Sequence, residues 1–472
     1  MQQSERSKML GEMPMTKLVP KVGLPIMVSM IVQALYNVVD SIFVARYNPN
    51  ALTAVSLAYP VQMLMIALSV GMGVGVSSLL SRKLGAGQRA EARRAAWNGL
   101  LIEGSGCLLF MIIGLFLAPT LLHLLVSDNL QNAESIREMG TTYLSIVTTF
   151  SQGVFMAVLF ERMLQATGNT VNSMLTQLAG AVTNIILDPI MIFGLLGFPS
   201  LGIAGAAIAT VTGQFVSAGI GFTLNQRRNP ELRLKLSDFA LDTALLGGIL
   251  VVGLPSTVMQ AIGSVMNVGM NGLLSSFEQG NAAVNVLNVY FKLQSFVFMP
   301  VFGLGSGMIA IVGYNYGARN RARVYEAIKV ALMWAGSIML AGMLIFQLMP
   351  EVLMSIFDSD AEPEVARQMR EMGVVALRII SWNFVPAAIG ITLSNVFQAV
   401  GKGIYSMIIS ICRQLLVLLP VAYLLKAVFG TVDAVWWCFV SAEAISLLLS
   451  LLLYRRCDRT MLQPLDGPAR VS

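Results

Sequence analysis

Twelve long apolar stretches follow one another along the chain and are separated by short polar segments. Each is long enough to cross the hydrocarbon layer of a membrane as an α-helix of about 20 residues. They lie near 20–45, 52–81, 95–120, 138–159, 170–194, 201–224, 244–275, 282–313, 328–350, 372–391, 404–428 and 431–454. The period-two alternation typical of transmembrane strands is not seen. The pattern therefore predicts an all-α polytopic membrane protein with twelve transmembrane helices.

The composition agrees with this interpretation. Of 472 residues, 56% are hydrophobic and only 12% are charged, whereas soluble domains carry roughly 25% charged residues. The single histidine, His123, and four widely spaced cysteines leave no pattern for a zinc site, a disulfide framework or a catalytic triad. We therefore expect neither an enzyme nor a cofactor.

Positive charge is concentrated in alternate loops. Lysine and arginine gather in 82–94, 227–235 and 319–329 and near both ends of the chain, and they explain the net charge of +6. Cytoplasmic loops of membrane proteins carry such an excess, so we expect a multi-pass protein of the cell membrane with both termini in the cytoplasm. The basic patches are short and lack interleaved aromatic residues, which argues against nucleic-acid binding.

The two halves of the sequence repeat at an offset of about 230 residues. "GLPIMVSMIVQALYNVVD" in the first half corresponds to "GLPSTVMQAIGSVMNVGM" in the second, and "QATGNTVNSM" corresponds to "QAVGKGIYSM". Each half holds six spans, an even number, so both halves enter the membrane in the same orientation. We predict two pseudo-symmetric six-helix bundles, 1–225 and 244–472, joined by a cytoplasmic linker at 226–243. Rocking of two such bundles around a central cleft gives alternating access.

Two acids within the spans of the first half are candidates for function. Asp40 lies about 19 residues after Lys21, and Asp188 lies a similar distance after Asn169. With a rise of about 1.5 Å per residue, both carboxyl groups reach a similar depth in their helices. We therefore expect them to share one polar pocket.

Polar neighbours accompany both acids on their helix faces. Gln33 and Tyr36 share a face with Asp40, and Gln177 and Asn184 share a face with Asp188. Charged residues inside a membrane are costly and are candidates for function. A buried pair of carboxyl groups can take up a proton or a small cation such as Na+, in competition with an organic cation. The alternative is that each carboxyl group only makes a structural hydrogen bond to a neighbouring helix.

The second half lacks this arrangement. Met270 occupies the position that corresponds to Asp40, and no acid corresponds to Asp188. This asymmetry favours a functional role for the acids of the first half.

Other residues within the spans have less specific interpretations. Glu161 is expected to line an inner vestibule, and Met259 and Met266 are expected to face the cleft, where methionine suits ligands of varied shape. Together with Gln33 and Gln177, these three residues are the predicted lining of the substrate cavity. Four further charged residues have roles that the sequence leaves open: Glu103, Lys292, Arg413 and Glu443.

Several segments together resemble the MATE family, the multidrug and toxic compound extrusion transporters. They include the repeated segments above and also "GMGVGVSSLLSRKLGAG", "NIILDPIMIFG", "GIAGAAIAT" and "NAAVNVLNVYFKLQSFVFMPVFGLGSGMIAIVGYNYGAR". The resemblance covers nearly the whole chain. It implies a V-shaped exporter with two lobes, driven by H+ or Na+.

The resemblance also implies where the driving ion binds. Carried over by position, the coupling site comprises Asp40 of the first span, Asn184 and Asp188 of the fifth, and the hydroxyl of Thr210 in the sixth. Tyr36 and Gln33 fall where the family lines its N-terminal cavity. Another branch of the family uses acids on the seventh span, and this chain has none there.

The leading hypothesis is an antiporter that exports amphipathic, often cationic, organic compounds in exchange for H+ or Na+. The alternative is a lipid-linked oligosaccharide flippase of the same superfamily, which would require a strongly cationic cavity. The expected partners are small organic molecules and membrane lipid, and the chain is expected to act as a monomer.

Overall fold

The computed structural model describes residues 5–127, 132–357 and 363–466, and every regular element in these ranges is helical. Eleven continuous helical segments are long and apolar enough to cross a membrane, and a bent pair of helices, with an angle of 44°, makes a twelfth. Each overlaps one of the twelve predicted spans. The prediction of an all-α polytopic membrane protein is confirmed. Most helices extend beyond the apolar stretches because their ends continue into polar residues.

The first six spans are formed by α2 to α9. Their bounds are α2 (Met15–Tyr47), α3 (Pro49–Gly85), α4 (Arg89–Ile112), α5 (Ala118–Leu125), α6 (Ala133–Thr149), α7 (Gln152–Ala166), α8 (Thr170–Phe193) and α9 (Ile203–Arg228). A π-helical segment, Ile113–Leu117, joins α4 to α5 within the third span, and α6 and α7 form the bent fourth span. A short helix, α1 (Glu5–Glu12), precedes them and was not predicted.

The last six spans are formed by α10 to α19. Their bounds are α10 (Thr243–Ser275), α11 (Gly280–Gly317), α12 (Arg321–Leu348), α13 (Pro350–Ser355), α14 (Pro363–Ile380), α15 (Phe384–Ala399), α16 (Gly403–Ile411), α17 (Leu419–Phe429), α18 (Val432–Val435) and α19 (Trp437–Cys457). Two further π-helical segments are Cys412–Leu418, between α16 and α17, and Asp458–Leu462, after α19. The 3-10 turns are Leu195–Gly197, Leu236–Asp238, Ser381–Asn383 and Gln463–Asp466.

Local signals fix where several helices begin. The side chain of Asn48 accepts a hydrogen bond from the backbone of Asn50 at the sharp turn between α2 and α3. Asp242 caps α10 by accepting from the backbone N–H groups of Ala244 and Leu245. Such caps satisfy N–H groups that have no partner within the helix.

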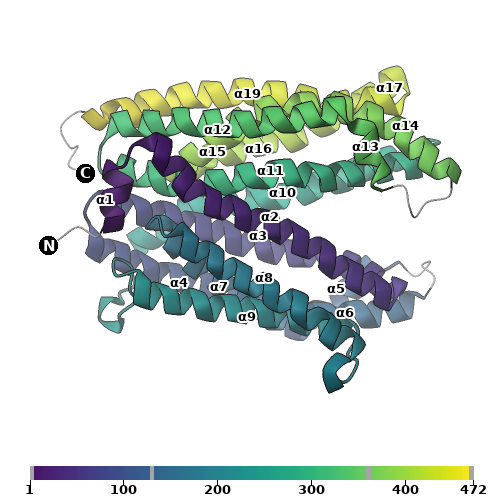
Figure 1. Cartoon of the computed structure of the whole chain (residues 1–472), viewed down its shortest axis with the longest axis horizontal. Coiled ribbons are helices and arrows are strands. Elements are labelled where there is room, and N and C mark those ends of the chain that lie inside the picture. Colours follow the sequence, from purple (N-terminus) through teal and green to yellow (C-terminus); the bar gives the residue numbers. More distant parts are fainter. Residues whose placement is uncertain (1–4, 128–131, 358–362, 467–472) are drawn as a thin grey trace.

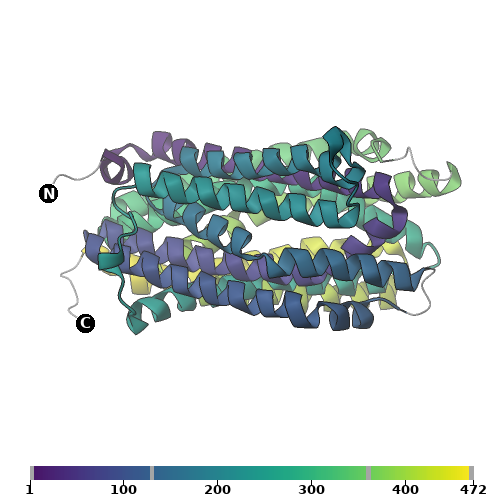
Figure 2. The same ribbon diagram turned by 90° about the horizontal axis from the view of Figure 1, so that it is seen from below.

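The helices form two bundles that lie side by side in Figure 1. In the view from below, the first bundle lies in front of the second (Figure 2). In the first bundle, which we call the N-lobe, α8 packs against α2 and α9, and α3 packs against α4, α6 and α7. In the second, the C-lobe, α11 and α12 pack against α15, and α10 packs against α16. The lobes meet through α2 and α3 on one side and α10 and α11 on the other.

Glycine residues line this contact between the lobes. A Cβ atom at Gly75 would overlap the carbonyl oxygen of Ile249, and one at Gly303 would lie 2.8 Å from the Cα of Met27. Small residues let helix backbones approach closely in membranes. These contacts lie near the end of the molecule where α1 lies and α19 ends, which we call the terminal end. The bundles diverge toward the opposite end (Figure 1).

Candidate functional site

Asp40 and Asp188 meet in the interior of the N-lobe. Asp40 is on α2 and Asp188 is on α8, and these helices pack against each other. The two carboxyl groups lie close enough to interact electrostatically. Asp188 is fully buried and Asp40 is partly buried. The structure thus brings together the two acids that were expected to share a pocket.

Close packing of α8 and α9 adds Asn184 and Thr210 to this site. A Cβ atom at Gly213 of α9 would lie only 2.7 Å from the carbonyl oxygen of Gly180 on α8. This close approach brings Thr210 to Asn184. The amide nitrogen of Asn184 lies 3.2 Å from Oδ1 of Asp188 and 3.4 Å from Oγ1 of Thr210. The four predicted residues therefore form one cluster.

Three oxygen atoms of this cluster are buried without a hydrogen-bond partner among the described residues. They are Oδ1 of Asp40, Oδ1 of Asn184 and Oδ2 of Asp188. Buried polar atoms normally have partners, and those that lack one require an explanation. Oxygen atoms suit both a proton and a small hard cation such as Na+. Pro189 follows Asp188 within α8 and has no backbone N–H group. The carbonyl oxygen of Ile185, four residues earlier, therefore lacks its usual helical hydrogen bond and adds another polar atom near the acids.

Two tyrosine residues interact with the acids. Tyr36 of α2 and Tyr143 of α6 both interact electrostatically with Asp40 and Asp188. Tyr143 is almost fully buried, and its hydroxyl group donates to Oε1 of Gln62 on α3 at 3.4 Å. Tyr36 was predicted at this site, whereas Tyr143 and Gln62 were not. Tyr143 lies in the fourth span without a polar neighbour at helical spacing, so the sequence carried no signal for it.

Glu161 belongs to a second buried network of the N-lobe. Ser173 lies 3.4 Å from Oε1 of Glu161 and accepts a hydrogen bond of 3.0 Å from Gln165, which in turn accepts one of 2.9 Å from Arg162. Gln177 also contacts Glu161. Gln177 therefore belongs with Glu161 rather than with the acid pair, because Asp188 comes eleven residues after Gln177 on α8, which corresponds to roughly 16 Å along the helix. Glu161 is 7% exposed and thus lines no open vestibule in this conformation.

The comparisons with known proteins cover both lobes. A family model described as MatE matches residues 25–190 and 255–424, one segment in each half of the chain. The chain belongs to the MatE family. The multidrug export protein MepA of Staphylococcus aureus is 25% identical over 454 residues, which cover 94% of this chain and 95% of MepA.

Solved structures agree with this membership. An outward-facing multidrug resistance MATE family transporter is 26% identical, covers 98% of this chain and 99% of its own, and superposes with a TM-score of 0.89. A MOP superfamily transporter from Pyrococcus furiosus is 26% identical and superposes with a TM-score of 0.88. The match covers 99% of this chain and 100% of that transporter. As a MatE family member, the chain is a transporter and not an enzyme.

The C-lobe of this MatE family member also contains buried charge. Arg413, in the π-helical segment Cys412–Leu418, lies 3.5 Å from the carboxyl group of Glu443 on α19. Lys292 instead is exposed, with its ammonium group 5.8 Å from the ring centre of Phe357. Met270, at the position that corresponds to Asp40, is fully buried in the hydrophobic core. The two lobes are therefore chemically different at corresponding positions.

The residues predicted to line a substrate cavity are scattered. Gln33 is exposed on α2, while Met259 and Met266 are partly buried on α10. The sulfur of Met259 lies 4.0 Å from the side-chain nitrogen of Gln398, and Met266 packs against the hydrophobic core of the C-lobe. Their role in binding substrate stays a prediction. Glu103, whose role was open, is fully buried on α4 and interacts electrostatically with Arg162.

Proposed function

We propose that this chain exports amphipathic, often cationic, organic compounds in exchange for H+ or Na+. The observation that carries the proposal is the cluster of Asp40, Asn184, Asp188 and Thr210, with three buried oxygen atoms that lack partners in the part of the chain that the structure describes. The name of its relative MepA, a multidrug export protein, supports the substrate class. Charged groups inside membrane proteins often mark ion pathways.

The cluster suits exchange because its charge changes when an ion binds. Without a bound cation, the two carboxyl groups repel each other and attract a cationic substrate. A proton or Na+ removes that charge and weakens the attraction. Transport requires that each ligand binds one conformation better than the other, and the two lobes supply the moving parts of such a cycle.

The proposal includes the surroundings of the protein. The chain lies in the cell membrane as a monomer, with the terminal end toward the cytoplasm. Basic residues at this end support the orientation, as in the turn between α3 and α4 and the segment between α9 and α10.

The flippase alternative is less well supported. It would require a strongly cationic cavity, but the buried Arg162 and the partly buried Arg413 both have acidic neighbours.

Everted membrane vesicles with an imposed pH or Na+ gradient test the function. Uptake of a cationic dye such as ethidium is measured for the parent protein and for Asp40→Asn and Asp188→Asn. We expect gradient-driven uptake in the parent and its loss in both variants at equal amounts of folded protein. The matched control is Glu138→Gln, the same acid-to-amide change at an exposed site of α6. Parental uptake in both variants would reject the coupling assignment.

The two gradients identify the driving ion. Uptake that follows an imposed pH gradient in the absence of Na+ assigns H+. Uptake that requires a Na+ gradient at equal pH on both sides assigns Na+. No uptake under either gradient, with folded parent protein in the vesicles, would reject export of this substrate class.

A further inference from the structure

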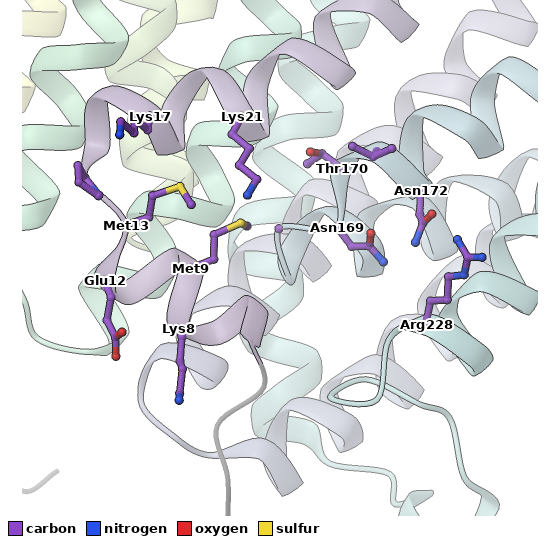
Figure 3. A pocket seen from close by; sticks show the side chains of 13 residues that line it. Lys8, Met9, Glu12, Met13, Lys17, Lys21, Asn169, Thr170, Asn172 and Arg228 are labelled. Carbon is purple, nitrogen blue, oxygen red and sulfur yellow. The ribbon is translucent and has the colours of Figure 1, made fainter.

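A second pocket lies at the terminal end of the N-lobe, apart from the acid pair. It encloses about 820 Å³ between two walls. One wall is α1 with the beginning of α2, and the other is the turn between α7 and α8 with the end of α9 (Figure 3). Nothing in the proposed transport cycle uses this pocket.

The charge around this pocket is mainly positive. Lys8, Lys17 and Lys21 line it from one wall and Arg228 from the other, and Glu12 is the single acid among the lining residues. In Figure 3, Lys21 descends from α2 toward the turn that carries Asn169. A concave surface with charge of one sign attracts ligands of the opposite sign, so the pocket favours an anion.

Buried hydrogen-bond donors face the same space. Asn169 is only 6% exposed, yet its amide nitrogen has no acceptor among the described residues, and it lines the pocket. A buried donor without a partner costs roughly 1–3 kcal/mol, so an acceptor from a ligand would be stabilising there. Asn172, 5% exposed, adds a second amide side chain in the first turn of α8.

The helix that starts at this pocket strengthens the preference for an anion. Asn169 directly precedes α8, a helix of 24 residues, and no side chain in the described ranges caps its first N–H groups. The positive end of a helix dipole and free N–H groups together form a common anion site. The pocket is therefore lined by lysine side chains, by an amide donor without a described acceptor and by the N-terminus of a helix.

The α1 part of the first wall is attached to the C-lobe, whereas Lys17 and Lys21 lie on α2 of the N-lobe. The amide of Asn315 on α11 donates to the carbonyl of Leu10 at 3.1 Å, and Arg323 on α12 donates to Leu10 and Met13 at 3.1 and 2.8 Å. These bonds fix α1 to the C-lobe. The opposite wall, with Asn169, is part of the N-lobe. A ligand that contacts both Lys8 on α1 and Asn169 would connect the lobes at the terminal end.

We propose that this pocket binds the phosphate group of an anionic phospholipid and thereby stabilises the conformation that is closed at the terminal end. Lys21 lies near the start of the first span and Asn169 directly before the fifth. Both are therefore at the level where lipid headgroups lie. Basic residues next to transmembrane helices attract anionic lipids in this way. A free phosphate ion has the same chemistry, and the experiment separates the two sources.

Binding is measured by calorimetry on the purified full chain in a neutral detergent. The probes are inorganic phosphate, dihexanoyl-phosphatidylglycerol and dihexanoyl-phosphatidylcholine. We expect phosphatidylglycerol to bind and phosphatidylcholine to bind far more weakly. Lys17→Gln combined with Lys21→Gln should weaken binding roughly ten-fold, because each lysine contributes to the attraction. The control pair, Lys329→Gln with Lys402→Gln, removes the same charge outside the pocket and should leave the affinity unchanged.

Asn169→Asp tests the buried donor separately. The added carboxylate would face and repel the bound phosphate, so binding should be lost. A thermal unfolding transition in the absence of ligand shows that the variant is folded. Should this variant fail to fold, the lysine pair still decides the result. Binding of inorganic phosphate but not of phosphatidylglycerol would overturn the lipid assignment. Equal binding of both lipids, or equal losses in the two lysine pairs, would overturn the anion site itself.

The closed state is tested by a distance measurement between the lobes. Spin labels at exposed positions of α9 and α12 near the terminal end report their separation. We expect phosphatidylglycerol to increase the fraction of short distances in the parent and to have no effect in the lysine-pair variant. An unchanged distribution in the parent would refute the stabilising role.

Discussion

On α8, the side-chain amide of Asn184 donates a hydrogen bond of 3.2 Å to Oδ1 of Asp188, one helical turn further along. The same nitrogen lies 3.4 Å from the hydroxyl oxygen of Thr210 on α9. An amide cannot ionise, so Asn184 holds the carboxyl group of Asp188 in place without adding charge. Its own carbonyl oxygen has no hydrogen-bond partner among the residues described by the structure. Asn184 is thus a candidate both to position Asp188 and to bind the ion.

Replacement of Asn184 by alanine should impair coupling. The variant removes one donor to Asp188 and one unpaired oxygen, and we expect gradient-driven dye uptake to fall about ten-fold, the effect of roughly 1.4 kcal/mol. Thr183→Ala is the matched control, because the Thr183 hydroxyl only donates to the carbonyl of Ala179 in its own helix. Vesicle uptake at a fixed gradient measures both variants. Equal uptake by Asn184→Ala and the parent would contradict the role of Asn184.

Acidification should weaken the binding of a cationic dye. Protonation of the acid pair removes negative charge, so the attraction falls as the pH falls and returns as the pH rises. Fluorescence anisotropy of ethidium with purified protein measures the affinity across this range. The double variant Asp40→Asn with Asp188→Asn should bind weakly and without pH dependence. The same pH dependence in the parent and the double variant would show that other groups are responsible.

Gly75→Ala should destabilise the contact between the lobes. The new methyl group would overlap the carbonyl oxygen of Ile249 and lie 2.9 Å from the backbone nitrogen of Gly253, and backbone atoms cannot rotate away. Overpacking of this kind costs about 1–3 kcal/mol. Thermal unfolding in detergent should therefore begin at a lower temperature. Gly104→Ala serves as the control, because a methyl group there meets no described atom within 4 Å. Equal unfolding temperatures of the Gly75→Ala and Gly104→Ala variants would contradict the prediction.

Arg413 should be required for stability and dispensable for transport. Arg413→Met leaves the carboxyl group of Glu443, which is 7% exposed, without its cation. Loss of one member of a fully buried pair costs about 3–5 kcal/mol. Arg413 is 28% exposed, so we expect a loss of about 1–3 kcal/mol.

A double variant separates the two roles of the pair. Arg413→Met combined with Glu443→Gln removes both charges and should restore most of the stability and retain dye uptake. Thermal unfolding and vesicle uptake are compared across the single and double variants. A stable double variant without uptake would show that the C-lobe pair takes part in transport.

Much of the acid site could be predicted because helix geometry is regular. Equal distances along α2 and α8 from Lys21 and Asn169 place Asp40 and Asp188 at similar depth, and spacing along the helix predicts their polar neighbours. The assignment of Thr210 to the same site as Asn184 required the family resemblance. The contact between α8 and α9 that brings these two residues together depends on the close approach of Gly180 and Gly213. Nothing in the spacing of residues shows which faces of two helices meet.

Other features depend on tertiary packing that the sequence does not show. Gln177 shares a helix face with Asp188 but contacts Glu161, because its depth in the membrane differs. Tyr143 comes from a bent span, and its approach to the acids depends on the packing of α6 against α3. The short helix α1 has a polar sequence, and its position follows from its hydrogen bonds to α11 and α12. The second pocket depends on α1, and the sequence therefore did not predict it.

The helix α3 is long enough to reach from the contact between the lobes deep into the N-lobe. It is continuous over 37 residues, or roughly 55 Å, and its last part contacts the C-lobe while other parts contact α4, α6 and α7. Gly75 lies against α10 at the crossing of the two lobes. In the proposed transport cycle, tilting of α3 about this crossing would move its two ends in opposite directions. Opening toward one side of the membrane would then close the other side, as exchange between two ligands requires.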